Sequence, residues 1–196
     1  THNFMGHFSD IDYYKLGENL DYVSWDNYPD NQWGGSQYEY VSMAHENMRG
    51  IKNRNFVVME EQAGPCGWDV VGRTPKPGQL RLWTYQAVMH GCEGVVYFRF
   101  RTALFGMEQY WYGVLDHDGV PRRRFYEIKQ VGQELKKLEK YIVGADNSYE
   151  ALIYKSYDDV WSHEIKRHKA GFDYRNLLYA YYKANADLNV TTAVSD

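Results

Sequence analysis

The feature that most constrains the fold is a short apolar run that ends in carboxylates, residues 56–61 (Phe-Val-Val-Met-Glu-Glu). Consecutive apolar, β-prone residues are typical of a strand that is buried on both faces, as in a parallel sheet. A carboxylate at the end of such a strand costs several kcal/mol if it is buried without a partner. In an α/β barrel, however, the C-terminal ends of the strands carry the chemistry. The run therefore favours a parallel α/β fold with a functional carboxylate, Glu60, at that edge.

The residues around Glu60 suit the cleavage of a sugar. Adjacent residues of a strand point to opposite sides, so at most one of Glu60 and Glu61 faces a cleft; the alternative is a solvated acidic pair. The loop that follows leads to Trp68. A carboxylate attacks or stabilises an oxocarbenium-like centre, and an aromatic ring packs on the C–H face of a sugar. The 17% aromatic content fits a carbohydrate cleft, or else a Tyr-rich core and surface.

Alternating strand and helix patterns run through the first 140 residues or so and predict parallel strands with right-handed crossovers. Four strand-then-helix units are half of the eight in a closed barrel. The predicted strands are 1–5, 22–25, 56–59 and 94–100, and the predicted helices are 10–19, 38–50, 78–90 (ending at Gly91) and 123–141.

Beyond the turn at 144–147 the pattern restarts. Residues 151–154 and 191–194 read as strands, with a helix over 173–185 between them. We interpret this as the opening βαβ of a second α/β domain. The predicted domains are therefore 1–145 and 146–196.

Composition excludes several classes of protein. A net charge of −4 and a pI near 6.0 exclude a strongly basic binder of nucleic acid or of a membrane surface. No apolar run approaches the ~20 residues of a membrane span. The two cysteines, Cys66 and Cys92, lie in unlike contexts, which favours a reduced cytoplasmic protein. The chain starts at Thr1 with a strand pattern and no signal peptide, which predicts that it begins inside a larger protein.

Some motifs resemble metal sites but have the wrong spacing. His163 and His168 are five residues apart, so they do not share a helix face as zinc ligands would. The segment 116–119 has too few acidic positions for a calcium loop and reads as a turn. Neither a metal nor a cofactor is expected. Arg99 and Arg101 are candidates for sugar or carboxylate ligands, or for structural counter-charges.

Other segments form an ordered set of motifs: Asn3-Phe4-Met5-Gly6, Ser24-Trp25-Asp26-Asn27-Tyr28-Pro29, Val58-Met59-Glu60 with Trp68, 81–87, 94–101 and 106–111. Together they resemble glycoside hydrolase family 42 β-galactosidases over nearly the whole chain. The resemblance implies the second half of a (β/α)₈ TIM barrel with strands five to eight, followed by the first βαβ of a flavodoxin-like domain that commonly helps the full-length enzyme to form a trimer. It also implies retaining hydrolysis of terminal, non-reducing β-D-galactosides.

The resemblance also implies roles for individual residues. Glu60 matches the catalytic nucleophile, and Tyr28 matches a tyrosine that supports the nucleophile and touches the sugar. Trp68 matches a tryptophan that forms a wall of the galactose subsite. Phe98 matches an aromatic residue that lines this subsite from the eighth strand.

Two further positions concern sugar selectivity. Glu108 matches a glutamate that hydrogen-bonds galactose hydroxyls. Tyr112 stands where many members of the family have a histidine that contacts a sugar hydroxyl. Glu61 stands where glutamine is common, and no role follows from the resemblance.

The acid/base of the family, a glutamate after an asparagine near the end of the fourth strand, would precede Thr1 together with the first four strands. We therefore expect a fragment that carries the nucleophile, lacks the acid and is inactive without the missing N-terminal half of the barrel. The alternative is a non-catalytic half-barrel that binds sugars or assembles with copies of itself, because an open half-barrel exposes the edges of its sheet and needs a partner.

Overall fold

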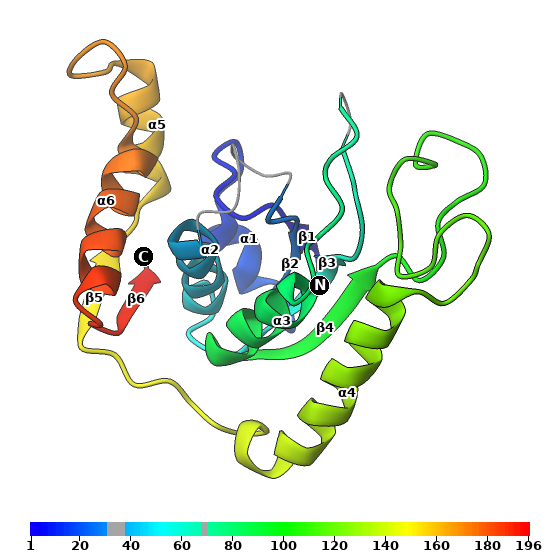
Figure 1. The fold of residues 1–196 in the computed structure, drawn as a ribbon. Helices are drawn as coiled ribbons and strands as arrows, with labels where there is room; N and C mark the ends of the chain where they lie inside the picture. The colour runs from blue at the N-terminus through cyan, green and yellow to red at the C-terminus, as the bar shows by residue number, and fades with distance from the viewer. Residues whose placement is uncertain (31–37, 68–69) are drawn as a thin grey trace.

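A computed structural model describes residues 1–30, 38–67 and 70–196 of the chain. Its first four strands form one parallel sheet in the order β1-β2-β3-β4 (Figure 1). They are β1 (Asn3–Phe4), β2 (Ser24–Asn27), β3 (Phe56–Gln62) and β4 (Cys92–Phe98). The predicted alternation of parallel strands and helices is confirmed.

Helices separate these strands and cover one face of the sheet. Aromatic and aliphatic side chains from the two layers, among them Phe4, Trp25, Phe56 and Met48, are almost completely buried between them. On the sheet's other face Val96 of β4 is 51% exposed. The helices are α1 (Tyr13–Glu18), α2 (Tyr38–Gly50), α3 (Gln79–Met89) and α4 (Arg123–Ile142).

Local sequence explains where these elements begin and end. Asp12 caps α1 by accepting hydrogen bonds from the backbone N–H groups of Tyr14 and Lys15. Gly91 follows the C-terminus of α3 with a φ of 88°, the left-handed conformation that the sequence predicts there. The third strand is longer than predicted, because it continues through Glu60 and Glu61 to Gln62.

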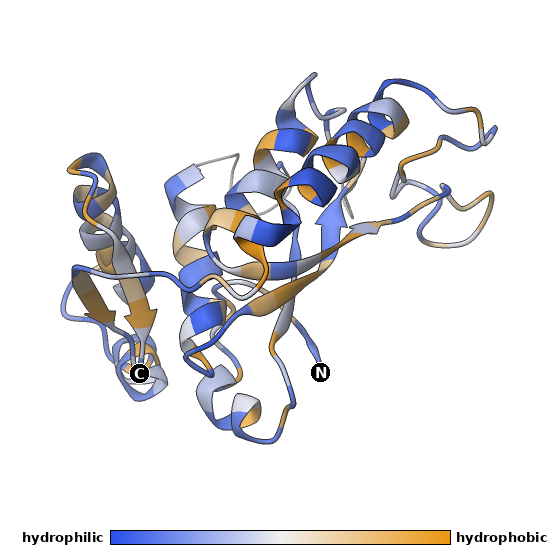
Figure 2. Ribbon diagram, turned by 90° about the horizontal axis from the view of Figure 1, so that it is seen from below, coloured by the Kyte–Doolittle hydropathy of each residue, from blue (hydrophilic) through white to orange (hydrophobic). Residues whose placement is uncertain are grey.

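The C-terminal part holds a second parallel pair of strands, β5 (Ala151–Tyr154) and β6 (Thr192–Ser195). Figure 2 shows that apolar residues are concentrated in these two strands. Helix α6 (Tyr174–Asp187) corresponds to the predicted helix. Helix α5 (Tyr157–Ile165) was not predicted, although Ser156 provides an ordinary N-cap by accepting from the N–H of Asp158.

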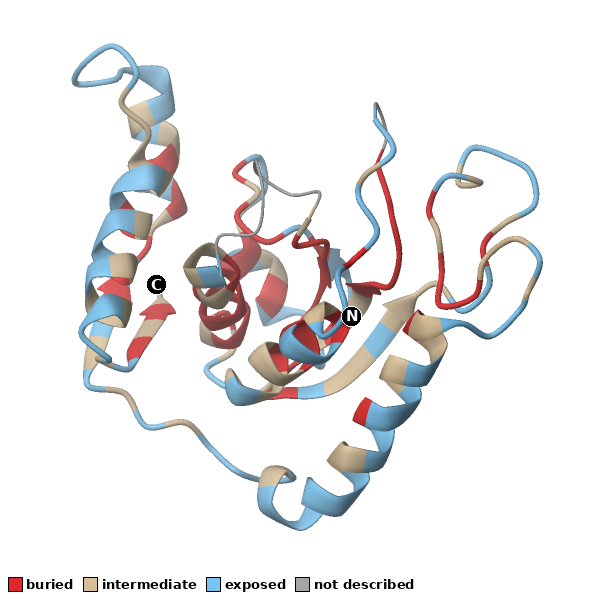
Figure 3. Cartoon of the chain, viewed as in Figure 1, coloured by how far each residue is buried: buried red, intermediate tan, exposed pale blue. Residues whose placement is uncertain are grey.

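Helix α2 is buried from two sides and joins the two sheets. Figure 3 shows it buried along most of its length. Met43 packs with Ile153 and Val194 of the second sheet, whereas Met48 packs in the core of the first. At Gly50, a Cβ atom would lie 1.9 Å from the carbonyl oxygen of Val194, so only glycine permits this approach. None of the helices in the described ranges is long and apolar enough to cross a membrane.

Candidate active site

At the C-terminal edge of the four-stranded sheet, Glu60 of β3 contacts side chains from β1 and from the segment that follows β2. The Tyr28 hydroxyl donates a hydrogen bond to Glu60 Oε2 over 2.5 Å. The Asn3 side-chain amide donates to Glu60 Oε1 over 3.2 Å. Each carboxylate oxygen thus has a donor, while the side chain remains partly exposed at the edge. Such an arrangement fixes a carboxylate and leaves it accessible.

An irregularity in β3 sets the position of Glu60. The pairing with β2 runs from Trp25 opposite Val58 directly to Asp26 opposite Glu60, so Met59 is an extra residue in β3. A bulge of this kind re-aims the side chains beside it and is common next to active sites.

Glu61 belongs to a different environment from its neighbour. It is fully buried and accepts from Asn27 Nδ2, at 3.0 Å to Oε2 and 3.3 Å to Oε1. Burial raises the pKa of the Glu61 carboxyl to about 8, an effect that the hydrogen bond from Asn27 reduces. The alternative of a solvated acidic pair is therefore wrong.

A second carboxyl group, Asp26, lies opposite Glu60 and was not predicted as a site residue. Asp26 is only 7% exposed. Burial is the main cause that raises the pKa of the Asp26 carboxyl to about 7, and the charge of Glu60 is the second. A hydrogen bond from Asn3 lowers this pKa in part. The segment 26–29 can be read from the sequence as a simple turn, but Asp26 and Asn27 belong to strand β2. One sequence signal could have indicated Asp26 as a site residue. It is a carboxylate that follows an apolar strand residue, Trp25, just as Glu60 follows Met59.

Aromatic rings form a cluster beside Tyr28. The rings of Tyr28 and Trp111 meet edge to face, with centroids 4.8 Å apart at 89°. The ring of Phe98, at the end of β4, also meets the Trp111 indole edge to face, with ring centroids 6.4 Å apart and an angle of 82° between the ring planes. Trp111 thus links two predicted site residues, and the sequence predicted no role for it beyond its place in a motif. Trp68 lies outside the described residues.

The loop after β4 carries the remaining predicted residues. Arg99 Nη1 donates to Glu108 Oε2 over 3.2 Å, so this arginine is a counter-charge for Glu108. Tyr112 packs its ring edge to face on His117 at 5.0 Å, and its backbone N–H donates to the carbonyl of Pro65. The last contact ties the loop after β4 to the loop after β3. In this chain Glu108 and Tyr112 therefore lie on a tethered loop.

The structure describes the two motifs whose residue types resemble metal ligands. The rings of His163 and His168 lie 4.8 Å apart, because α5 ends at Ile165 and the chain turns back. No group of three or more potential His, Cys, Asp or Glu ligands occurs in the part of the chain that the structure describes. The backbone N–H of Gly119 donates to the carbonyl of Asp116, which confirms the predicted turn.

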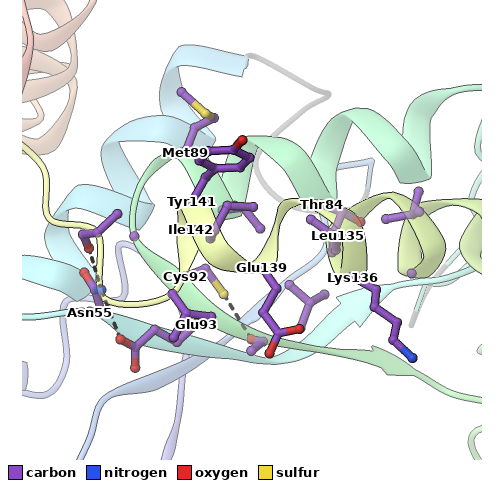
Figure 4. A pocket seen from close by; sticks show the side chains of 18 of the residues that line it. Asn55, Thr84, Met89, Cys92, Glu93, Leu135, Lys136, Glu139, Tyr141 and Ile142 are labelled. Atoms are coloured by element: carbon purple, nitrogen blue, oxygen red, sulfur yellow. Dashed lines mark hydrogen bonds between the residues drawn. The ribbon is translucent and has the colours of Figure 1, made fainter.

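A separate pocket of about 900 Å³ lies between α3, β4 and α4 (Figure 4). Its lining is mainly apolar and includes Val95, Val131, Leu135 and Ile142. It contains none of the residues around Glu60. The edge of the sheet therefore remains the candidate site.

Comparison with known proteins identifies the family. The model of the glycoside hydrolase family 42 β-galactosidases matches residues 1–138. The chain belongs to glycoside hydrolase family 42. The β-galactosidase BgaA from a Thermus species is 36% identical over 198 residues, which cover 94% of this chain and 30% of that protein. BgaA from Clostridium cellulovorans is 38% identical over 185 residues, which cover 93% of this chain and 28% of that protein.

Solved β-galactosidase structures align with the whole described fold. The enzyme from Bacillus circulans sp. alkalophilus superposes with a TM-score of 0.92 at 32% identity, covering 98% of this chain and 29% of that one. The enzyme from Halorubrum lacusprofundi gives a TM-score of 0.90 at 33% identity, covering 99% of this chain and 30% of that one. This family 42 chain therefore spans about 30% of the length of the relatives that it matches.

Proposed function

We propose that this chain is the nucleophile-bearing part of a retaining β-galactosidase and that Glu60 is the nucleophile. The observation that carries the proposal is the carboxylate of Glu60, fixed at the C-terminal edge of a parallel sheet by Tyr28 and Asn3 and still partly exposed. Family membership supports the reaction type.

In the proposed reaction, Glu60 attacks the anomeric carbon of a terminal β-D-galactoside and forms a covalent glycosyl–enzyme intermediate. The leaving oxygen takes a proton from a second carboxylic acid, which then acts as a base on the water that hydrolyses the intermediate. Retention requires the two carboxyl groups to lie about 5–5.5 Å apart. We assign the acid to the part of the protein that precedes this chain. Hydrogen bonds from Tyr28 and Asn3 hold both oxygens of Glu60, so that the attacking oxygen is oriented before the sugar arrives.

The remaining assignments extend this proposal. Phe98, Trp68, Glu108 and Tyr112 would form part of the sugar subsite, with Tyr28 beside the nucleophile. Residues 1–145 would supply strands five to eight of the (β/α)₈ barrel, and residues 146–196 the start of a flavodoxin-like domain through which the full-length enzyme trimerises. The relatives' greater length supports the proposal that parts of the full enzyme lie outside this chain.

The test uses the full-length protein and an activated aryl β-D-galactoside. Glu60→Ala should lower turnover by several powers of ten with the fold intact, because covalent catalysis is lost while sugar binding remains. Azide should partly restore cleavage and give the inverted α-galactosyl azide. Glu61→Gln is the matched control and should stay active. A dead Glu61→Gln with an active Glu60→Ala would show that the wrong carboxylate was chosen.

The chain alone provides a second arm of the test. Purified residues 1–196 should show no activity above background. General acid catalysis, usually worth about 10²–10⁴-fold, is missing, and even an activated substrate should bind weakly because half of the sugar subsite would lie outside this chain. Robust turnover by this chain, abolished by Glu60→Ala, would contradict the assignment of the acid to a preceding segment. A full-length protein that binds galactosides without cleaving them would favour the non-catalytic alternative.

A further inference from the structure

A carboxyl group that the proposed reaction does not use faces the proposed nucleophile. Asp26 on β2 is paired with Glu60 on β3 in the register of the sheet. It is 93% buried, since 7% of its surface is exposed. Placing a buried carboxyl group opposite a second, partly exposed one is unfavourable when both are ionised. Such an arrangement calls for an explanation beyond packing.

One amide connects the two carboxyl groups. Asn3 Nδ2 donates to Glu60 Oε1 over 3.2 Å, and the Asn3 side chain also hydrogen-bonds Asp26. An asparagine NH₂ group has two hydrogens, so it can serve both partners at once. An ionised carboxylate only accepts hydrogen bonds, and it therefore holds the NH₂ end of Asn3, rather than the carbonyl end, toward Glu60.

We infer that Asp26 is a positioning residue, which acts through Asn3 to orient the carboxylate of Glu60. The inference rests on the proposed function of Glu60. When Asp26 is ionised, Asn3 has a single favoured amide orientation. When Asp26 is protonated, its O–H group can donate to the Asn3 carbonyl, which allows the amide to turn its oxygen toward Glu60 and withdraw a hydrogen bond from it.

The groups around Asp26 set the pH range of this effect. Glu60 faces it from β3 and Asn3 from β1. Asp26 in turn raises the pKa values of Tyr28, which follows β2, and of Tyr13 on α1. Burial and the charge of Glu60 raise the pKa of Asp26 to about 7. The ionised, competent form therefore increases as pH rises through about 7, and turnover should increase with it.

The test measures kcat and KM for an aryl β-D-galactoside between pH 5 and pH 9 with the full-length protein. Asp26→Asn keeps the size of the side chain but cannot ionise. We expect kcat at pH 8 to fall about 10- to 100-fold, as for the loss of one charge-assisted hydrogen bond. KM should change less than about threefold, because the sugar contacts remain. The rise of kcat from pH 6 to pH 8 should be shallower than in the wild type.

Two further variants separate positioning from folding. Asn3→Ala should give the same loss of kcat and the same shallower profile, and the double variant should be no worse than either single variant, because both act along one path. Glu61→Gln is the matched control, since it removes a buried carboxyl group from the next position of β3 that is bonded to Asn27 instead. It should leave kcat and the pH profile unchanged. If Asp26→Asn does not fold, Asn3→Ala carries the test.

The outcomes distinguish this inference from the proposed function. Wild-type kcat and pH profile in Asp26→Asn, or in Asn3→Ala, would overturn the positioning role while the loss of activity in Glu60→Ala still supports the nucleophile. Additive losses in the double variant would also overturn it. A wild-type protein without β-galactosidase activity would refute both.

Discussion

Replacing Glu61 by glutamine measures what a buried carboxyl group costs this fold. Burial raises the pKa of Glu61 from 4.5 to about 8. The folded protein therefore binds this proton more tightly than the unfolded chain does. Below pH 4.5 both states hold the proton and the group has no effect on stability. As pH rises from 4.5 to 8, the unfolded chain loses its proton while the folded protein keeps it, so stability falls.

The structure sets the size of this effect. At about 1.4 kcal/mol for each unit of pKa, Glu61 lowers the free energy of unfolding by about 3 kcal/mol at pH 7 and by about 5 kcal/mol well above pH 8. Glutamine is neutral at every pH, and its side-chain oxygen can still accept from Asn27. Its extra N–H groups cost about 1–3 kcal/mol if they stay unpaired, but this cost does not depend on pH.

The assay is urea unfolding of the full-length protein, followed by tryptophan fluorescence at pH 5, 6, 7 and 8. Trp25 is almost completely buried in the core that the sheet forms with its helices, and it reports the loss of that core. The stability of Glu61→Gln relative to the wild type should increase by about 3–4 kcal/mol between pH 5 and pH 8. If the free energies of unfolding of the two proteins change with pH in parallel, the reasoning is refuted, whatever the difference between them at one pH.

Three other substitutions test separate parts of the structure. Gly50→Ala should destabilise the protein by about 1–3 kcal/mol, because the added Cβ would clash with the Val194 carbonyl. In the control Gly132→Ala on α4, the added Cβ meets open space and should not destabilise the protein. The midpoints of thermal unfolding of the two variants test this difference. Lys155→Met should stabilise the protein at pH 7, because burial lowers the pKa of this lysine from 10.5 to about 7 and its positive charge therefore lowers the free energy of unfolding. The gain in stability should disappear as pH approaches 10.5, where the unfolded chain also loses the proton. A gain that does not depend on pH would contradict this origin. Tyr28→Phe should lower kcat about 10- to 100-fold through the loss of one charge-assisted hydrogen bond to the proposed nucleophile, and an unchanged kcat would remove the tyrosine from the mechanism.

The sequence predicted the parts of this structure that depend on local pattern. The run 56–61 indicated a buried parallel strand, and the period of two placed Glu60 and Glu61 in different environments, as their separate partners confirm. Helix α5 was not predicted, because it spans only nine residues and its main local signal is the N-cap at Ser156.

The partners of Glu60 could be predicted only in part. Tyr28 was predicted through the family resemblance, but Asn3 and Asp26 were not. Their contacts depend on the register between strands, which Met59 shifts by one residue. A register shift arises from how two strands pair, and no single-strand pattern encodes it. The roles of the subsite residues stay predictions.

The burial of α2 from two sides bears on how this polypeptide can be divided. A chain cut after residue 145 would retain the four-stranded sheet but expose Met43, which now packs on Ile153 and Val194. It would also leave Asn47 without the donor that Lys155 provides at 3.1 Å. The backbone amides of α2 should therefore exchange with solvent only when both sheets open. We therefore expect the cooperative unit of unfolding to extend past the loop at 144–147 to β6.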